Sequence, residues 1–304
     1  QAIMDIAIQE NGQILICGGL DWANNYGFIK RYNSDLTPDL DFNNLATIDN
    51  GTVTTVRLFN SKIYLAGTFS SVNSTTKNDI VRLNMDGSLD VTFDTGTGTT
   101  AILGSITIQD DGKIIIGGNS YLTSFNDENV YRVGRLNADG SIDHSVGFAY
   151  GMNSKPSVIT YKDNKFWFGV STKVNDKEDF YFLRYNDNGT LDDTFTPIQL
   201  NWFNAPDTPL AYKFINETIV INRTNNLTRS GFSKLSLTGV RDISFHPDMS
   251  YYGTISDADY KNGTLIVGGY FDRLDGFSTF NLGRLNADGT CDHTFSADNN
   301  SNTT

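Results

Sequence analysis

One segment recurs six times along this chain of 304 residues. Each copy carries a basic residue, then an apolar residue or Tyr, then Asn or Ser, and successive basic residues lie 49 to 53 positions apart. The six anchors are Arg31, Arg82, Arg135, Arg184, Lys234 and Arg284. A repeat of this length is a supersecondary unit that buries its apolar face only by stacking on its neighbours. The chain is therefore expected to be a repeat protein.

Two more positions keep a fixed distance from each anchor. The eighth residue after the anchor is always aspartate: Asp39, Asp90, Asp143, Asp192, Asp242 and Asp292. The eleventh is Phe42, Phe93, Phe195, Phe245 or Phe295, with Val146 as the exception. We expect each base to pair with its own aspartate across a hairpin, because such a pair would meet the same packing need in every unit. A ring of carboxylates that binds a metal or ligand is the alternative.

Each repeat reads as four short strands. Turn dipeptides such as Asn11-Gly12 and Asp86-Gly87 separate alternating or continuous apolar runs, and no stretch has an amphipathic helical period. The second strand often ends in Gly-Gly, which is expected to let neighbouring backbones approach closely. The pattern predicts an all-β fold: a six-bladed β-propeller of four-stranded antiparallel blades. The predicted repeats of this single domain (1–304) span residues 3–44, 45–96, 97–149, 150–197, 198–247 and 248–297.

The strings DGKIIIGG…RLNADGSID in repeat three and NGTLIVGG…GRLNADGTCDHTF in repeat six resemble the delta-60 repeat. This is a β-propeller repeat of bacterial surface proteins and phage proteins. The resemblance runs from Ile3 to Ala297 and is weakest in repeat five, which has Asn216-Glu217 at its first turn and no Gly-Gly. It implies a propeller with a binding or structural role, and it supplies no catalytic residues.

Composition excludes several classes of protein. The net charge of -12 argues against a protein that tracks nucleic-acid phosphates, and no apolar stretch is long enough for a membrane helix. Cys17 and Cys291 cannot make a disulfide framework and are expected to be small core residues. The first residue is Gln1 and not Met, which is compatible with a processed piece and with a further domain upstream.

No catalytic, cofactor or metal site is predicted. His144, His246 and His293 lie in different repeats without the spacing of zinc ligands, and no Gly-x-Ser-x-Gly motif occurs. The Asn-x-Asp-Gly turns offer oxygen ligands as a calcium loop does, but they lack the closing Glu, and turn geometry already accounts for them.

Binding is expected where the repeats differ, because loops vary on a fixed scaffold. Three aromatic-rich segments supply the predicted partner-binding residues: Trp22, Asn24, Asn25, Tyr26, Trp202, Phe203, Tyr251 and Tyr252. The alternative is that these aromatic side chains cap the core or pack between blades, which is the favoured interpretation for Trp202 and Phe203.

The sequence therefore predicts a non-enzymatic structural or interaction propeller. We expect a phage-tail or virion protein, or a bacterial surface or secreted protein, that mediates attachment or assembly within a larger structure. Its partner would be a protein or a surface glycan, and the acidic chain favours a neutral or basic one. The alternatives are a lectin-like carbohydrate-binding propeller and a hydrolase or lyase at the channel mouth.

Overall fold

The computed structural model describes residues 2–19, 27–99, 103–118, 122–130, 132–148, 159–174, 177–199, 212–215, 217–224, 230–245, 247, 254–261 and 263–295. Within them the chain is all-β apart from one short helix, and the strands pair antiparallel wherever their register is described. The chain divides into two compact units, Gln1–Trp167 with Tyr185–Thr190 and Phe168–Arg184 with Leu191–Thr304. No helix in the described ranges has the length and apolar character that crossing a membrane requires.

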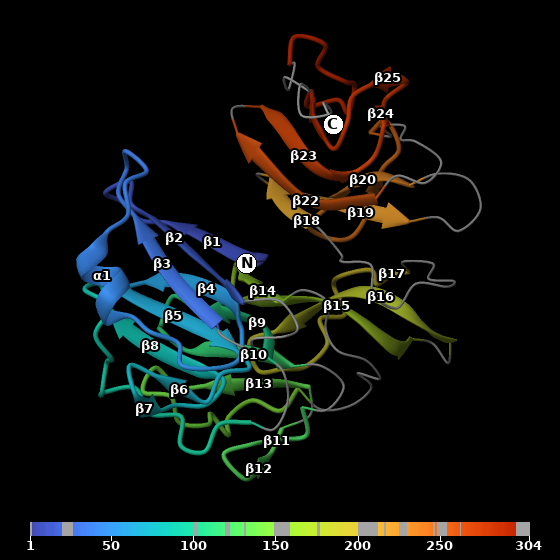
Figure 1. Ribbon diagram of the computed structural model, residues 1–304. Coiled ribbons are helices and arrows are strands. Elements are labelled where there is room, and N and C mark those ends of the chain that lie inside the picture. The colour runs from blue at the N-terminus through green and yellow to red at the C-terminus, as the bar shows by residue number, and fades with distance from the viewer. Residues whose placement is uncertain are drawn as a thin grey trace. The chain divides into compact units, whose positions relative to one another are not determined.

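The first three repeats each form a three-stranded sheet. Their elements are β1 (Ala2–Ile8), β2 (Ile14–Gly19), β3 (Gly27–Tyr32), α1 (Leu40–Leu45), β4 (Val53–Phe59), β5 (Lys62–Gly67), β6 (Ser71–Val72), β7 (Thr75–Thr76), β8 (Ile80–Asn84), β9 (Leu103–Ile108), β10 (Ile114–Gly118), β11 (Ser124–Phe125), β12 (Glu128–Asn129) and β13 (Val133–Leu136). The sheets are β1-β2-β3, β4-β5-β8 and β9-β10-β13. Figure 1 shows α1 beside β3, with β4 next to β1 and β2.

Repeats four and five each form a four-stranded sheet, and repeat six forms a three-stranded sheet. Their elements are β14 (Ile159–Lys162), β15 (Lys165–Val174), β16 (Lys177–Asn186), β17 (Ile198–Gln199), β18 (Tyr212–Ile215), β19 (Thr218–Thr224), β20 (Ser230–Ser236), β21 (Arg241–Asp242), β22 (Thr254–Lys261), β23 (Thr264–Tyr270), β24 (Arg273–Leu274), β25 (Phe277–Ser278) and β26 (Leu282–Leu285). The sheets are β14-β15-β16-β17, β18-β19-β20-β21 and β22-β23-β26.

The glycines at turns and strand ends are required by backbone geometry. In the turn between β1 and β2, Gly12 has a φ of 83°, a conformation that a Cβ would strain. At the end of β2, a Cβ on Gly18 would lie 2.0 Å from the carbonyl oxygen of Ala2. The strand-end glycine therefore permits a close backbone approach, as expected.

The predicted outer strand is much shorter than expected. In repeat five it is the two-residue β21, and in four other repeats a single bridge replaces it: Tyr32↔Pro38, Leu83↔Leu89, Leu136↔Ile142 and Leu285↔Cys291. The aspartate explains the early end, because the Asp90 carboxylate accepts hydrogen bonds from both the N–H and the hydroxyl of Thr92. The chain is thereby turned away from the sheet immediately after the bridge.

Repeats two, three and six carry a feature that was not predicted from the sequence. Between their second and third long strands lie two-stranded ribbons, β6-β7, β11-β12 and β24-β25. Each turns through two residues of positive φ, for example Asn73 (50°) and Ser74 (58°). Such a pair forms a two-residue hairpin, for which Asn and Asp are suited.

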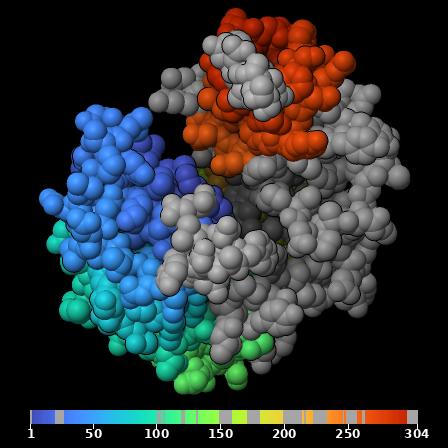
Figure 2. Space-filling model, in the orientation of Figure 1, coloured from blue at the N-terminus to red at the C-terminus, as the bar shows by residue number. Residues whose placement is uncertain are grey.

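Apolar side chains of neighbouring repeats pack together in shared clusters. One cluster joins Leu15, Cys17 and Phe42 of repeat one to Val56 and Leu65 of repeat two. Others join repeats two and three and repeats five and six. The sheets thus bury their faces on their neighbours, as propeller blades do. In Figure 2 the described parts of repeats one and two, coloured blue to cyan, form one continuous surface.

Candidate functional site

Every repeat anchor forms an ion pair with the aspartate eight residues later. The guanidinium nitrogen lies 2.7 or 2.8 Å from the carboxylate oxygen in five repeats, and the Lys234 ammonium lies 3.5 Å from Asp242. The expected ion pairs are therefore confirmed in all six repeats.

In repeats two, four and six, the guanidinium also contacts its own repeat in two other ways. The Arg82 Nη2 donates to the hydroxyl of Thr92 at 2.9 Å, and its guanidinium carbon lies 4.9 Å from the centre of the Phe93 ring. Repeats four and six have the same hydrogen bond to a Thr hydroxyl and the same stacking on a Phe ring. The Phe eleven residues after the anchor is thus the platform on which the guanidinium stacks.

The guanidinium also reaches the next repeat. Arg82 Nη1 donates to the carbonyl of Ala138 at 2.7 Å, and Arg135 Nη1 donates to the carbonyl of Asp187 at 3.1 Å. Arg31 and Arg184 donate in the same way to the carbonyls of Met85 and Leu237. Each acceptor is the second residue of the Asn-x-Asp-Gly turn, or its counterpart, in the following repeat. One arginine therefore joins two repeats at four of the five junctions between successive repeats.

The aspartates are kept ionised by this network. Burial alone would raise the pKa of Asp90, but hydrogen bonds from Thr92, Lys62 and Arg82 hold it well below its usual range. Asp143 is held low in the same way by Lys113, Ser145 and Arg135. These carboxylates are structural acceptors whose lone pairs are already used.

The Asn-x-Asp-Gly turns also use their carboxylates internally. The Asp86 carboxylate accepts hydrogen bonds from the backbone N–H of Ser88 at 2.9 Å and from its hydroxyl at 2.6 Å. Four other turns repeat the arrangement with Asp35, Asp139, Asn188 and Asp288. Among the described residues, no group of three or more His, Cys, Asp or Glu is arranged to hold a metal ion.

Repeat five departs from the pattern. Its anchor is Lys234, whose ammonium lies 5.9 Å from the centre of the Phe245 ring and makes only the looser pair with Asp242. The Asp242 side chain is 36% exposed, whereas that of Asp90 is 5% exposed. Across the same strand pair, Thr218 occupies the position at which repeat two has Lys62.

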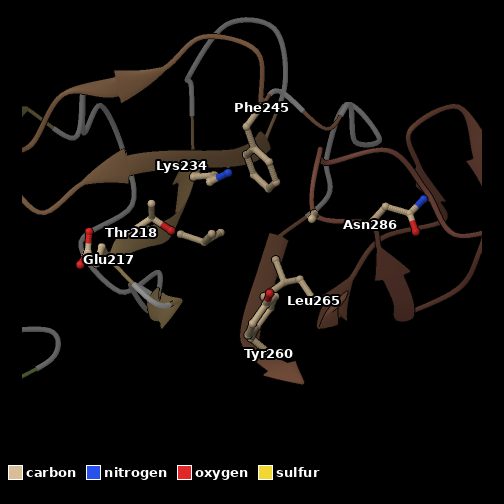
Figure 3. Close-up of a pocket in the computed structure, with 9 residues that line it drawn as sticks. Glu217, Thr218, Lys234, Phe245, Tyr260, Leu265 and Asn286 are labelled. Carbon is tan, nitrogen blue, oxygen red and sulfur yellow. The ribbon is translucent and has the colours of Figure 1, made fainter. Parts of the chain in front are cut away.

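A cavity of about 470 Å³ is lined by the anchor Lys234 and by Ala287, the counterpart of the turn residue that accepts from the anchor at other junctions. Val220, Phe245, Tyr260 and Leu265 form its apolar part, and Glu217, Thr218, Lys234, Asn286 and Ala287 complete the lining. Figure 3 shows Lys234 and Phe245 of repeat five on one side, with Tyr260 of β22 and Leu265 of β23 opposite. Both sides belong to the second compact unit.

The cavity is the candidate site, and it was not predicted from the sequence. The eight predicted partner-binding residues lie outside the described residues. The signal that could have found the cavity is the single Lys among six anchors. Lysine carries the same charge as arginine but lacks the planar fork of donors that holds two acceptors together.

Comparison with a known protein family supports the repeat assignment. The profile described as "Domain of unknown function (DUF5122) beta-propeller" matches residues 60–93, 109–145, 168–195 and 261–295. These segments fall in repeats two, three, four and six. No curated protein matches the sequence.

Two solved structures with a TM-score above 0.5 share the fold of this chain at low identity. PorZ, a surface component of the type-IX secretion system of Porphyromonas gingivalis, is 10% identical, with a TM-score of 0.56 over 95% of this chain and 40% of that one. A prolyl endopeptidase is 8% identical, with a TM-score of 0.51 over 96% of this chain and 42% of that one. A gluconolactonase of Xanthomonas campestris is 14% identical, covering 88% of this chain and 84% of that one, with a TM-score of 0.45.

This chain spans about two fifths of the length of PorZ and of the prolyl endopeptidase. At such identities the likeness concerns the fold alone. The matched segments and the shared fold agree with the stacked antiparallel sheets, and four segments of the chain resemble the repeats of a β-propeller family.

Proposed function

We propose that this chain is a non-enzymatic interaction module of a bacterial surface or secreted protein, and that it mediates attachment or assembly. The observation that carries the proposal is the arginine network, which joins successive repeats and occupies the recurrent carboxylates. A scaffold fixed in this way can present variable loops and one irregular junction to a partner. The bacterial-surface setting is supported by PorZ, a surface component with the same fold. The phage-tail or virion setting stays a prediction.

We further propose that the six repeats are the blades of one closed ring. Six evenly spaced anchors and the guanidinium hydrogen bonds to the following repeat support this count. A closed ring should unfold in one cooperative transition with coincident changes in circular dichroism and Trp fluorescence. A crystal structure with five or seven blades, or with two separate sandwiches, would contradict the proposal.

The function is tested by binding. The whole chain, immobilised, is exposed to intact bacterial cells and their surface extracts, and in parallel to a glycan array. We expect retention of a protein partner, weakened when Trp22 and Tyr26 are both replaced by Ala; replacement of Trp202 and Phe203 is the matched comparison. Specific glycan binding would support the lectin-like alternative. Turnover of a glycan or ester would overturn the non-enzymatic interpretation.

A further inference from the structure

We propose that the cavity between repeats five and six is a receptor for a guanidinium group, filled by an arginine side chain of a protein partner. This inference rests on the proposed function, because it names the group through which that partner is held. Its basis is the comparison of one junction with the four others in the same molecule.

At the other junctions, the chain's own arginine occupies the equivalent position. In repeat four, Arg184 donates to Asp192 at 2.7 Å, to the hydroxyl of Thr194 at 2.8 Å and to the carbonyl of Leu237 in repeat five, while it stacks on Phe195. A carboxylate, a hydroxyl, an aromatic face and a turn carbonyl therefore together define a guanidinium site in this protein.

The same four groups exist at the junction of repeats five and six. Phe245 and Ala287, which line the cavity, supply the ring and the turn carbonyl. Asp242, which is paired with the lining residue Lys234, supplies the carboxylate, and Ser244, next to Phe245 in the chain, supplies the hydroxyl. The Ser244 hydroxyl donates to Oδ1 of Asp242 at 2.6 Å, and the Lys234 ammonium lies 3.5 Å from Oδ2. Within the described residues, no backbone N–H donates to the Ala287 carbonyl. The acceptors that bind arginine elsewhere are thus present here without an arginine.

Size and charge favour a planar cation. A volume of about 470 Å³ lies within the range of small-ligand sites, roughly 300 to 1,000 Å³. The negative charges of Glu217 and Asp242 together exceed the single positive charge of Lys234, and the whole chain carries a charge of -12. The Lys234 side chain is 28% exposed and flexible, so its ammonium can move toward solvent when a guanidinium enters.

The test uses the whole chain and Nα-acetyl-arginine amide as the probe, titrated by calorimetry. We expect it to bind at least tenfold more tightly than the matched Nα-acetyl-lysine amide, because a planar fork of donors can engage the carboxylate and the carbonyl together. Equal binding of the two probes, or preference for Nα-acetyl-glutamate amide, would overturn the proposal.

Substitutions localise the probe. Lys234→Arg recreates the other junctions, so its own guanidinium should fill the cavity and weaken probe binding at least tenfold. Asp242→Asn should also weaken it. Asp288→Asn removes the same charge from the turn that carries Ala287, and it copies the Asn188 turn, whose Asp187 carbonyl accepts from Arg135, so it should leave binding unchanged. Unchanged binding to folded Lys234→Arg would contradict the site.

The same variants separate this inference from the proposed function. If the unmodified chain retains a surface partner and Lys234→Arg retains it equally, the arginine receptor is wrong and the function stands. If the unmodified chain retains no partner but still binds the arginine probe at Lys234, the receptor chemistry holds and the interaction function fails.

Discussion

Arg82 and Asp90 are joined twice, through their side chains and through their backbones. The Arg82 Nε lies 2.8 Å from the Asp90 carboxylate, and the N–H of Asp90 donates to the carbonyl of Arg82 at 3.0 Å. Both side chains are largely buried, with exposed fractions of 11% and 5%. The pair therefore fixes the outer edge of the sheet and directs the guanidinium toward the next repeat.

Substitution of Asp90 is expected to lower the free energy of unfolding substantially. Asp90→Ala leaves the buried Arg82 and the nearby Lys62 without their carboxylate, and breaking a buried pair in this way costs about 3–5 kcal/mol. Urea unfolding followed by circular dichroism measures the loss. Asp242→Ala is the matched control, because its solvated carboxylate pairs only loosely with Lys234. Asp90→Ala should lose clearly more free energy of unfolding than Asp242→Ala. Equal losses would contradict the expectation that the buried pair contributes more than the exposed one.

Arg82→Lys gives repeat two the same anchor residue type as repeat five. The lysine keeps the charge beside Asp90 but loses the hydrogen bonds to Thr92 and to the carbonyl of Ala138. We expect the free energy of unfolding to fall by about 1–3 kcal/mol, since the buried charged group of the anchor loses two of its hydrogen bonds. Arg284→Lys is the control, because Arg284 is more exposed and should be less sensitive. No loss in Arg82→Lys would show that the junction bond contributes nothing.

Asp79 makes the stability of the folded chain depend on pH in the direction opposite to that of Asp90. Its side chain is buried and accepts a hydrogen bond from the N–H of Thr99 at 3.0 Å. Burial raises the pKa of Asp79 from 3.8 to about 6, and the hydrogen bond from Thr99 only partly opposes it. The folded chain therefore binds this proton more tightly than the unfolded chain between about pH 4 and pH 6.

The contribution of Asp79 to the free energy of unfolding consequently falls by up to about 3 kcal/mol as the pH rises through that window. Asp79→Asn keeps an acceptor for Thr99 and tolerates the φ of 62°, but it removes the titration. The variant should be more stable than the parent chain at pH 8 and equal to it at pH 4. Urea melts at both pH values measure this difference, and a difference that does not change with pH would refute the assignment.

The thiol of Cys17 is expected to be inert in the folded chain. Burial, followed by the nearby Asp5 carboxylate, raises the pKa of Cys17 to about 12, so roughly one thiol in ten thousand is ionised at pH 8. In a Cys291→Ala variant, Ellman's reagent should therefore react only after urea unfolding. Rapid reaction of the native variant would mean that Cys17 is not enclosed in its core cluster.

The repeat pattern allowed several local features to be predicted. The ion pairs, the hairpins and the strand-end glycines depend on residues that lie close together along the chain. A base and an aspartate eight apart, with Asp86-Gly87 between them, are brought face to face by the turn itself. The free cysteines and their burial also agree with the prediction.

Features that depend on neighbouring sheets could not be predicted in this way. The hydrogen bond from Arg82 to Ala138 crosses 56 residues, and nothing in either repeat alone specifies it. The burial of Asp79 likewise depends on how the segment around Thr99 covers it. The cavity at Lys234 requires both the substitution and the position of the Ala287 turn.

The sequence by itself thus determined the repeat, the class of strand and turn, and the pairing within each unit, because short-range spacing and turn chemistry decide these. Only the tertiary structure decided which carbonyl each guanidinium reaches, which carboxylate is desolvated and where a cavity remains. Those outcomes arise from the stacking of one sheet on the next, where the position of a neighbouring backbone determines whether a buried donor finds an acceptor.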